Sequence, residues 1–324
     1  MVQESMISEK EKVISLKSII LTGATGSIGL AIIRQCIANS IDVLAIINPN
    51  SLRKKNIPND KRVCIVECDL SNLGNLEADK SIMERFEGSA FIHLAWMSTS
   101  NDTDRNRITP QIANIQYAVD AVELANKLGC ISFVGSGSQA QYGRTDEVLT
   151  ETTPMHPETA YGMAKLCAEQ MTRLACKQFG IRHVWPRILS TYGPYSGQNT
   201  VINYTIDELL NNRSPELTRC EQIWDFIYVD DVARALLLLA EYGHDGEAYV
   251  IGYGKSNRLE NYMNQISEIV GASQKLGIGE REYGENTVMH LECDISKLTK
   301  DTSFVPQIEF EEGIRRILEW KWEK

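Results

Sequence analysis

A glycine-rich turn near the start of the chain restricts the fold more than any other feature. Gly23, Gly26 and Gly29 follow a short apolar run and precede a helical pattern that continues to Asn39. A strand, a tight turn and a helix in this order form a cradle for a pyrophosphate, since Gly23 permits the turn, Gly26 lets the backbone approach the phosphates and Gly29 lets the helix pack on the sheet. The alternative is that the glycines only terminate a strand. The surrounding strand and helix favour a dinucleotide site.

Short apolar segments bounded by turn residues recur after this turn and alternate with helical patterns. They are residues 43–47, 63–66, 90–94, 131–134 and 183–185. Segments of this length and composition are typical of strands buried on both faces of a parallel sheet. The alternation predicts an α/β protein with a doubly wound parallel sheet, that is, a Rossmann fold.

The 324 residues are enough for one large domain or two coupled domains. We expect a dinucleotide-binding Rossmann domain over residues 1–190, with a strand near 246–252 returning to its sheet. A smaller, discontinuous substrate lobe is expected over most of 191–324. Two helices are predicted within that stretch, 258–270 and 310–322.

Composition excludes several classes of function. The formal net charge of −10, without any run of lysine or arginine, disfavours nucleic-acid binding. The chain has no apolar stretch of about 18 residues, and residues 1–10 lack the apolar core of a signal peptide, so we expect no membrane partner and a cytoplasmic location. Eight cysteines without a Cys-x-x-Cys pair, and no clustered histidines, indicate neither a metal site nor a disulfide framework.

A tyrosine and a lysine four residues apart indicate the chemistry. Tyr161 and Lys165 lie in a helical segment, so both side chains project from one face. A phenol with a pKa near about 10 acts as an acid or base only if a nearby cation lowers that pKa. Ser138 follows an apolar strand, and a hydroxyl at the carboxyl end of such a strand opens into the ligand crevice of a doubly wound sheet. The alternative is a plain helix surface.

The order of these motifs resembles the extended short-chain dehydrogenases/reductases, in particular the NAD(P)-dependent nucleotide-sugar epimerases, dehydratases and reductases. The likeness covers nearly the whole chain. Other matching motifs are Cys68-Asp69-Leu70, His93-Leu94-Ala95-Trp96, Tyr142-Gly143 and residues 187–194, 224–231 and 294–297. Residues 193–199 and 221–231 look most like the reductases that finish CDP-activated dideoxyhexoses, with the 4-epimerases as their sister group.

The resemblance implies a role for each matching residue. As catalytic residues, Ser138 would hydrogen-bond the reacting oxygen, Tyr161 would exchange its proton, and Lys165 would lower the pKa of Tyr161 and hold the nicotinamide ribose. The dinucleotide would be bound by Gly23, Thr25, Gly26, Ser27, Ile28, Gly29, Asn48, Ser51, Arg53, Asp69, Leu70, Leu94, Ala95, Trp96, Tyr161 and Lys165. The nucleotide sugar would be bound by Trp96, Ser138, Gln139, Ser190, Asn199 and Trp224.

The end of the second predicted strand bears on the choice of cofactor. Related dinucleotide sites place an acidic residue there for the adenosine ribose hydroxyls, but this chain has Asn48. A neutral side chain removes the repulsion against a 2′-phosphate, and the basic stretch 51–55 offers positive charge, so we expect NADP(H) in preference to NAD(H). There are two alternatives to this prediction. The basic stretch is only a solvated loop, or the protein, as a family member with an asparagine at this position, uses NAD. By analogy Asp69 lies near the adenine; otherwise it is a helix N-cap.

The residues that begin with Ser138 exclude one reaction of this group. Dehydratases of this group carry Thr-Asp-Glu where this chain has Ser138-Gln139-Ala140, and an amide and a methyl group cannot shuttle the proton that dehydration requires. What remains is hydride transfer at a ring carbon, which we expect to be C4 of the sugar. An NADPH-dependent 4-keto sugar reductase is our first hypothesis, an NAD-dependent 4-epimerase is the second, and a non-catalytic dinucleotide sensor is the third.

Two departures from the family pattern concern the substrate. Ser190 replaces a common asparagine, and Trp224 replaces a common arginine that contacts the nucleotide. Either the diphosphate is held differently or the substrate is not a nucleotide sugar. Trp224 stacks on a base or is an ordinary core residue. The helices expected at 111–128 and 161–178 are the pair that in relatives meets a second subunit, so we also expect a homodimer.

Overall fold

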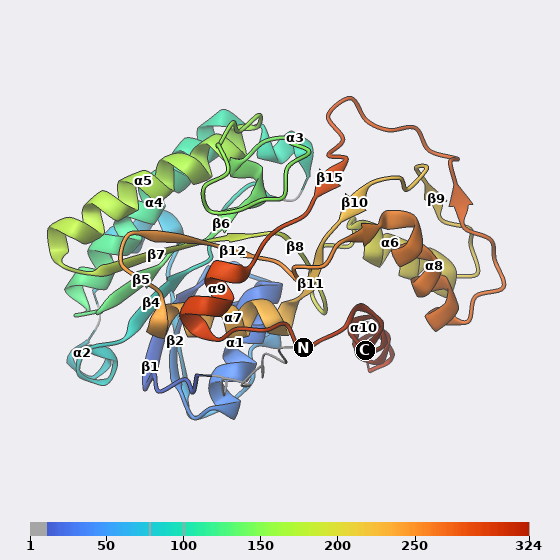
Figure 1. Ribbon diagram of the computed structural model, residues 1–324. Helices are drawn as coiled ribbons and strands as arrows, with labels where there is room; N and C mark the ends of the chain where they lie inside the picture. Colours follow the sequence, from blue (N-terminus) through green and yellow to red (C-terminus); the bar gives the residue numbers. More distant parts are fainter. Residues whose placement is uncertain (1–11, 78, 100, 324) are drawn as a thin grey trace, which may run out of the picture.

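The computed structural model describes residues 12–77, 79–99 and 101–323. Figure 1 shows a large lobe built around a sheet and a smaller lobe beside it. The sheet has eight strands in the order β12-β7-β5-β4-β1-β2-β3, with β6 also paired to β7. The strands are β1 Ser18–Thr22, β2 Asp42–Ile47, β3 Val63–Glu67, β4 Ala90–His93, β5 Ser132–Val134, β6 Gly137–Ser138, β7 Arg182–Ile188 and β12 Glu247–Ile251. All the pairings in this sheet are parallel.

The strand order reverses direction between β1 and β4. A crevice therefore opens at the carboxyl ends of these two strands, where open α/β sheets bind their ligands. The prediction of a doubly wound parallel sheet is confirmed.

Helices cover both faces of the sheet, as Figure 1 shows. Those of the large lobe are α1 Ser27–Ala38, α2 Lys80–Phe86, α3 Asp102–Arg105, α4 Ile108–Lys127, α5 Ala160–Phe179, α7 Val229–Tyr242 and α9 Ser296–Thr302. Alternate residues of β1 serve the two cores: Ile19 and Leu21 belong to the core that includes α1 and α7, whereas Ile20 belongs to the core that includes α4. Both faces of the strand are thus buried in apolar surroundings, which explains its uninterrupted apolar sequence.

The smaller lobe is built from three helices and several very short strands. They are α6 Val201–Leu210, α8 Leu259–Val270, α10 Phe310–Trp322, β8 Ser190–Tyr192, β9 Glu216–Leu217, β10 Ile223–Trp224, β11 Phe226–Tyr228, β13 Asn257–Arg258, β14 Gly277–Ile278 and β15 His290–Leu291. The chain enters the large lobe again in α7, β12 and α9. The domain boundary at residue 190 stays a prediction.

Two predicted elements differ from the observed ones in extent. The helix expected to begin at residue 111 begins at Ile108, since Pro110 lies in its first turn, where a missing backbone N–H costs nothing. The strand expected to end at residue 185 continues through Pro186 to Ile188. Pro186 is tolerated because its position falls between the partners on one side: β5 pairs with β7 as far as Val184, and β6 pairs with it only from Arg187.

Candidate active site

The glycine turn lies directly after β1 and is closed by its neighbours. Gly23 has φ of 74°, and a Cβ there would lie 2.8 Å from the backbone nitrogen of Ala95. A Cβ on Gly29 would lie 2.3 Å from the carbonyl oxygen of Gly23. Helix α1 follows with Gly26 as its N-cap and has no side-chain cap, so its first backbone N–H groups are available to an anion. These features fit the phosphates of a dinucleotide.

The end of β2 is tied to the end of β3 by side chains. Asn48 donates from Nδ2 to a carboxylate oxygen of Asp69 at 2.9 Å. Asp69 also accepts from the backbone nitrogen of Ser71 at 3.0 Å and thereby caps the 3-10 turn Leu70–Asn75. These hydrogen bonds, led by the one from the Ser71 backbone, lower the pKa of the Asp69 carboxyl group. An ionised carboxylate therefore adjoins Asn48, and the helix-cap alternative for Asp69 describes its local contacts.

The basic stretch after Asn48 is engaged within the protein. Lys54 forms an ion pair with Glu67 at 3.0 Å, and Arg53 donates to the carbonyl oxygen of Tyr195 at 3.4 Å. Ser51 donates to the hydroxyl of Thr25 at 3.2 Å. This contact joins the stretch to the glycine turn.

Helix α5 carries Tyr161 and Lys165 one turn apart. It begins after Thr159, whose hydroxyl accepts from the backbone nitrogen of Gly162 and caps the helix. The Lys165 ammonium is buried, donates to the carbonyl oxygen of Ser136 at 2.6 Å and lies 3.5 Å from the ring centroid of Trp96. Burial holds the pKa of Lys165 well below its usual value. Tyr161 meets Trp96 edge to face at 6.2 Å between ring centroids.

Ser138 and Tyr161 both line the cavity between the two lobes. Burial raises the pKa of the Tyr161 phenol, whereas the Ser138 side chain and the charge of Arg105 lower it. The Ser138 hydroxyl also donates to the side-chain oxygen of Gln139 at 2.5 Å. Arg105 was not anticipated because it ends the four-residue helix α3, which is too short to show a periodic pattern and carries no matching motif.

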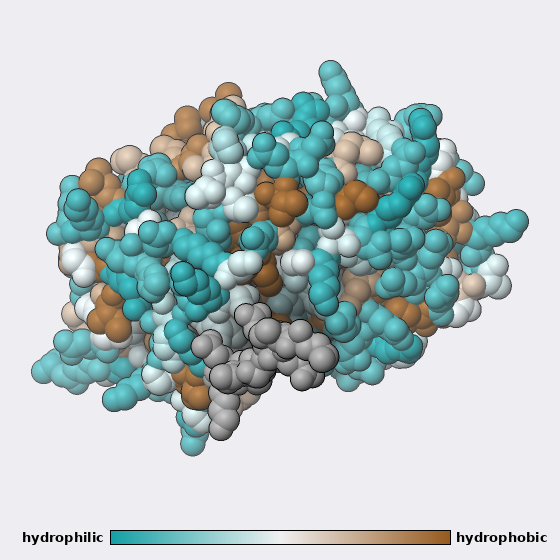
Figure 2. All heavy atoms as spheres, viewed as in Figure 1, coloured by the Kyte–Doolittle hydropathy of each residue, from teal (hydrophilic) through white to brown (hydrophobic). Residues whose placement is uncertain are grey.

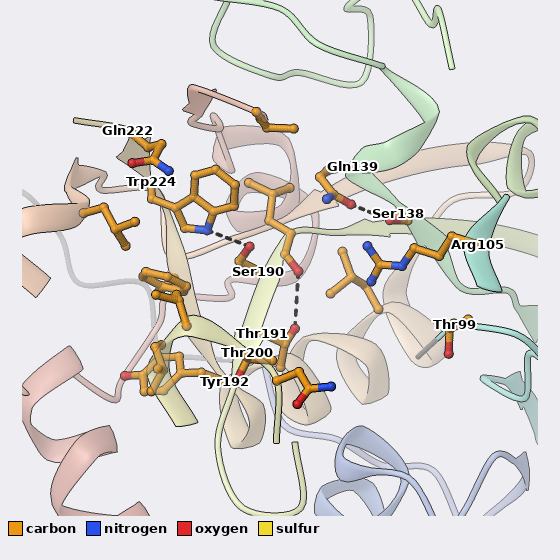
Figure 3. A pocket seen from close by; sticks show the side chains of 18 of the residues that line it. Thr99, Arg105, Ser138, Gln139, Ser190, Thr191, Tyr192, Thr200, Gln222 and Trp224 are labelled. Atoms are coloured by element: carbon orange, nitrogen blue, oxygen red, sulfur yellow. Dashed lines mark hydrogen bonds between the residues drawn. The ribbon is translucent and has the colours of Figure 1, made fainter. Parts of the chain in front are cut away.

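A cavity of about 1090 Å³ lies at the junction of the two lobes. Ten of the predicted site residues line it: Ile28, Leu94, Trp96, Ser138, Gln139, Tyr161, Lys165, Ser190, Asn199 and Trp224. Others lie outside its lining, along the glycine turn and the strand ends beside it: Gly23, Thr25, Gly26, Ser27, Gly29, Asn48, Ser51, Arg53, Asp69, Leu70 and Ala95. Residues that the sequence did not suggest also line the cavity, among them Thr99, Arg105 and Gln222 (Figure 3).

The two departures from the family pattern contact each other. Trp224 donates from its indole nitrogen to the hydroxyl of Ser190 at 2.8 Å, as the dashed line in Figure 3 shows. Trp224 is half-buried, lines the cavity and packs against Phe226 at 6.3 Å between ring centroids. It therefore combines a core contact with a face toward the cavity.

The charges around the cavity are asymmetric. Among the described lining residues, the large lobe contributes the cations Lys165 and Arg105 and no carboxylate. The small lobe contributes Arg281 and Glu216. The end of the cavity that holds Ser138 and Tyr161 thus carries positive charge.

Buried polar residues outside the cavity lining support this end of the cavity. The Nδ1 atom of His93 shares a hydrogen bond of 2.8 Å with the Thr22 hydroxyl. Burial lowers the pKa of His93 to about 3, so the imidazole is neutral. Asn114 on α4 bonds both the backbone nitrogen and the carbonyl oxygen of Met97, which fixes the loop after β4. Arg187 forms a buried ion pair with Glu169 at 2.8 Å. None of these three lines the cavity.

Sequence comparison decides the family. A sequence model of the NAD dependent epimerase/dehydratase family matches residues 19–252, well over half of the chain. The chain belongs to the NAD-dependent epimerase/dehydratase family. Members of this family are extended short-chain dehydrogenases/reductases and depend on a nicotinamide dinucleotide, so the prediction of an enzyme of this group is confirmed.

Individual members of the family match along nearly their whole length. The chain is 28% identical to a putative UDP-glucose 4-epimerase of Methanocaldococcus jannaschii, over 93% of this chain and 97% of that one. It is 25% identical to a dTDP-glucose 4,6-dehydratase of Salmonella typhimurium, over 93% and 92% of the two chains. Both epimerases and dehydratases therefore occur among its relatives.

Solved structures of the family share the fold. A UDP-N-acetylglucosamine 4-epimerase from Methanobrevibacter ruminantium superposes with a TM-score of 0.81 at 24% identity, covering 96% of this chain and 99% of that one. A dTDP-glucose 4,6-dehydratase from Streptomyces venezuelae, solved with NAD bound, gives 0.81 at 21% identity, covering 95% and 97%. In the described part of the chain, no helix is long and apolar enough to cross a membrane.

Proposed function

We propose that the protein is an NAD-dependent 4-epimerase of a nucleotide sugar. The observation that carries this proposal is that Ser138, Tyr161 and Lys165 line the same cavity, to which the described residues of the large lobe contribute no carboxylate. Such a set can move a proton between a sugar hydroxyl and a phenol, but it lacks the carboxylates that elimination of water requires. The relatedness to a putative UDP-glucose 4-epimerase supports the same reaction.

The cofactor is proposed to be NAD, which revises the expectation of NADP. The glycine turn and the N-terminus of α1 would hold the phosphates. At the adenosine end, the ionised Asp69 beside Asn48 would accept ribose hydroxyls and repel a 2′-phosphate, while Lys54 is already paired with Glu67. Solved members of this fold also carry NAD.

Each residue of the set has a distinct task. When bound, the dinucleotide would supply the acceptor for the hydride of the sugar C4 and the donor for its return. Tyr161 would take the proton from the C4 hydroxyl and return it, while Ser138 would hold the same oxygen by a hydrogen bond. Lys165, fixed by Ser136 and Trp96, would bind the nicotinamide ribose. The cavity of about 1090 Å³ leaves room for a sugar to turn over.

The nucleotide part of the substrate is proposed to bind toward the small lobe. Ser190, Asn199 and Trp224 line the cavity there, together with Arg281. Family members commonly carry an arginine at the position of Trp224. Among the described small-lobe residues that line the cavity, Arg281 supplies a guanidinium that would contact a diphosphate. Trp96 and Gln139, from the large lobe, would face the sugar.

Reduction of a 4-keto sugar is the second candidate. The neutral Asn48 and the resemblance of residues 193–199 and 221–231 to CDP-dideoxyhexose reductases favour it. It shares Ser138, Tyr161 and Lys165 with epimerisation and differs in that the dinucleotide is consumed.

A substrate panel separates the two candidates. The purified protein is incubated with UDP-, CDP- and dTDP-hexoses and a catalytic amount of NAD, and the anomeric protons are followed by NMR. We expect interconversion of C4 epimers without net change in absorbance at the nicotinamide band. Consumption of NADPH with a 4-keto sugar and no interconversion of epimers would instead establish the reductase.

A homodimer through α4 and α5 is also proposed. The two helices pack on each other and expose large apolar side chains: Ile108, Ile112, Met163, Met171 and Leu174. Figure 2 shows hydrophobic residues along the edge of the molecule where Figure 1 places α5. An exposed apolar face of this kind is typical of a protein interface.

Light scattering should give the mass of two chains for the wild type and of one chain for Leu174→Glu. A monomeric wild type would contradict the proposal of a homodimer.

A further inference from the structure

Arg105 extends from the end of α3 into the cavity beside Tyr161. Figure 3 shows its guanidinium directed into the space in front of Ser138 and Gln139. The guanidinium carbon lies 5.5 Å from the ring centroid of Tyr161, within the range of a cation–π contact. Its Nε atom is buried and has no hydrogen-bond partner in the part of the chain that the structure describes. The guanidinium therefore lies beside the phenol ring.

Lys165 lies at a similar distance from the same ring but is also engaged elsewhere. Its Nζ lies 5.7 Å from the ring centroid of Tyr161 but only 3.5 Å from that of Trp96, and it donates two hydrogen bonds to Ser136. A buried ammonium group readily gives up its proton, and burial does lower the pKa of Lys165. A guanidinium keeps its charge in the same surroundings.

We propose that Arg105 is a positioning residue whose permanent positive charge stabilises the deprotonated phenol of Tyr161. The proposal rests on the role of Tyr161 in the proposed function. Its charge adds to that of Lys165 and, unlike an ammonium group, does not titrate.

The groups that face the Tyr161 phenol agree with this role. They are Lys165 from the same helix, Arg105 from α3, the Ser138 hydroxyl from β6 and the Trp96 ring. The charge of Arg105 lowers the pKa of Tyr161. No carboxylate among the described cavity residues of the large lobe offsets it.

A titration of Tyr161 tests the proposal without a substrate. The protein is labelled with 13C at Cζ of tyrosine and titrated from pH 6 to 10.5 by NMR, with and without NAD. Tyr161→Phe identifies the resonance. In Arg105→Gln we expect the midpoint to rise by roughly 1 in pH, or to leave the range, because an opposite charge at this distance shifts a pKa by about that much. At a given pH below the midpoint, the phenolate fraction then falls about tenfold.

Three further variants make the test specific. Arg105→Lys should restore most of the wild-type midpoint, since it restores a charge. Arg107→Gln, at a neighbouring arginine that is 62% exposed and faces Asp104, should leave the midpoint unchanged. Arg105→Met, which keeps the aliphatic stem, replaces Arg105→Gln if that variant does not fold. Equal midpoints in the wild type and the neutral variants, including no titration in any of them, would overturn the proposal, as would an Arg105→Lys midpoint equal to that of Arg105→Gln.

The outcome is independent of the reaction. A shifted midpoint in a protein that converts no nucleotide sugar would uphold the role of Arg105 and refute only the proposed function. An unshifted midpoint in an active epimerase would refute the role of Arg105 alone.

Discussion

At the scale of single residues, the account depends on one phenol. Tyr161→Phe removes the phenol oxygen that is proposed to exchange a proton with the C4 hydroxyl, so kcat should fall by about 10²- to 10⁴-fold. The aromatic ring and its contact with Trp96 remain, so NAD binding should be unchanged in a fluorescence titration. Tyr242→Phe, outside the cavity, is the control. Retained turnover in Tyr161→Phe would exclude the proposed acid–base role.

The contact between Ser190 and Trp224 makes a second prediction at this scale. Ser190→Ala and Trp224→Phe each remove one partner of the same hydrogen bond, so their effects on the free energy of unfolding should not add. In a double-mutant cycle by urea unfolding we expect a coupling energy of about 1 kcal/mol. Additive effects would mean that the hydrogen bond contributes nothing to stability.

Sequence reasoning found the residues whose types are distinctive and missed those defined by neighbours. Tyr161 and Lys165 were found because helical spacing places them on one face. The pairing of Ser190 with Trp224 could not be predicted, because it joins β8 to β10, which belong to different sheets. Arg105 was missed for the same reason, since only the fold brings α3 to Tyr161.

At the scale of elements, the packing of α1 on the glycine turn decides whether the cradle forms. A Cβ in Gly29→Ala would lie 2.3 Å from the carbonyl oxygen of Gly23 and 2.7 Å from the Cα of Ala24, and both are backbone atoms. Helix α1 would have to shift, which should lower the free energy of unfolding by about 1 to 3 kcal/mol.

The same shift should abolish NAD binding in isothermal titration calorimetry, because the N-terminus of α1 moves away from the phosphates. Gly284→Ala is the matched control, since a Cβ there meets only the hydroxyl of Thr287 at 3.5 Å. Wild-type affinity for NAD in Gly29→Ala would show that the turn is not the phosphate site.

Elements with a clear period could be predicted, and elements defined by pairing could not. Strands β1 and β2 were recognisable because they are apolar on both faces. Strands of two residues, such as β10 and β15, have no pattern of their own and exist only through their partners. The end of β7 was missed because a proline inside a central strand usually ends it. Pro186 does not end β7, since it lies between the residues that pair with β5 and those that pair with β6.

At the scale of the whole molecule, buried histidines make the fold sensitive to acid. Burial lowers the pKa of His93 to about 3 and that of His183 to about 4, against about 6.5 in an unfolded chain. Below about pH 6.5 these histidines bind protons in the unfolded chain but stay neutral in the folded chain. Their contribution to the free energy of unfolding is therefore present above that pH and is lost as the pH falls toward 4. Asp225, with a pKa raised to about 6 by burial, opposes this trend between pH 6 and 4 but titrates only one proton.

Urea unfolding between pH 7 and 5 measures the effect. The free energy of unfolding should decline with acidification, and the slope in His93→Gln should be smaller by up to about 1.4 kcal/mol per pH unit. His156→Gln, at an exposed position, is the control. A slope in His93→Gln equal to that of the wild type would contradict the neutral state of His93 in the fold.

The central claim is that a hydride leaves C4 of a nucleotide sugar and returns to it while Tyr161 carries the proton. The direct measurement uses a UDP-hexose deuterated at C4, incubated in ordinary water with the protein and catalytic NAD, and follows both epimers by NMR and mass spectrometry. We predict that the C4 epimer forms with its deuterium retained and that Tyr161→Phe forms almost none. Loss of the deuterium to solvent, or no conversion of any sugar in the UDP, CDP and dTDP panel, would contradict the account.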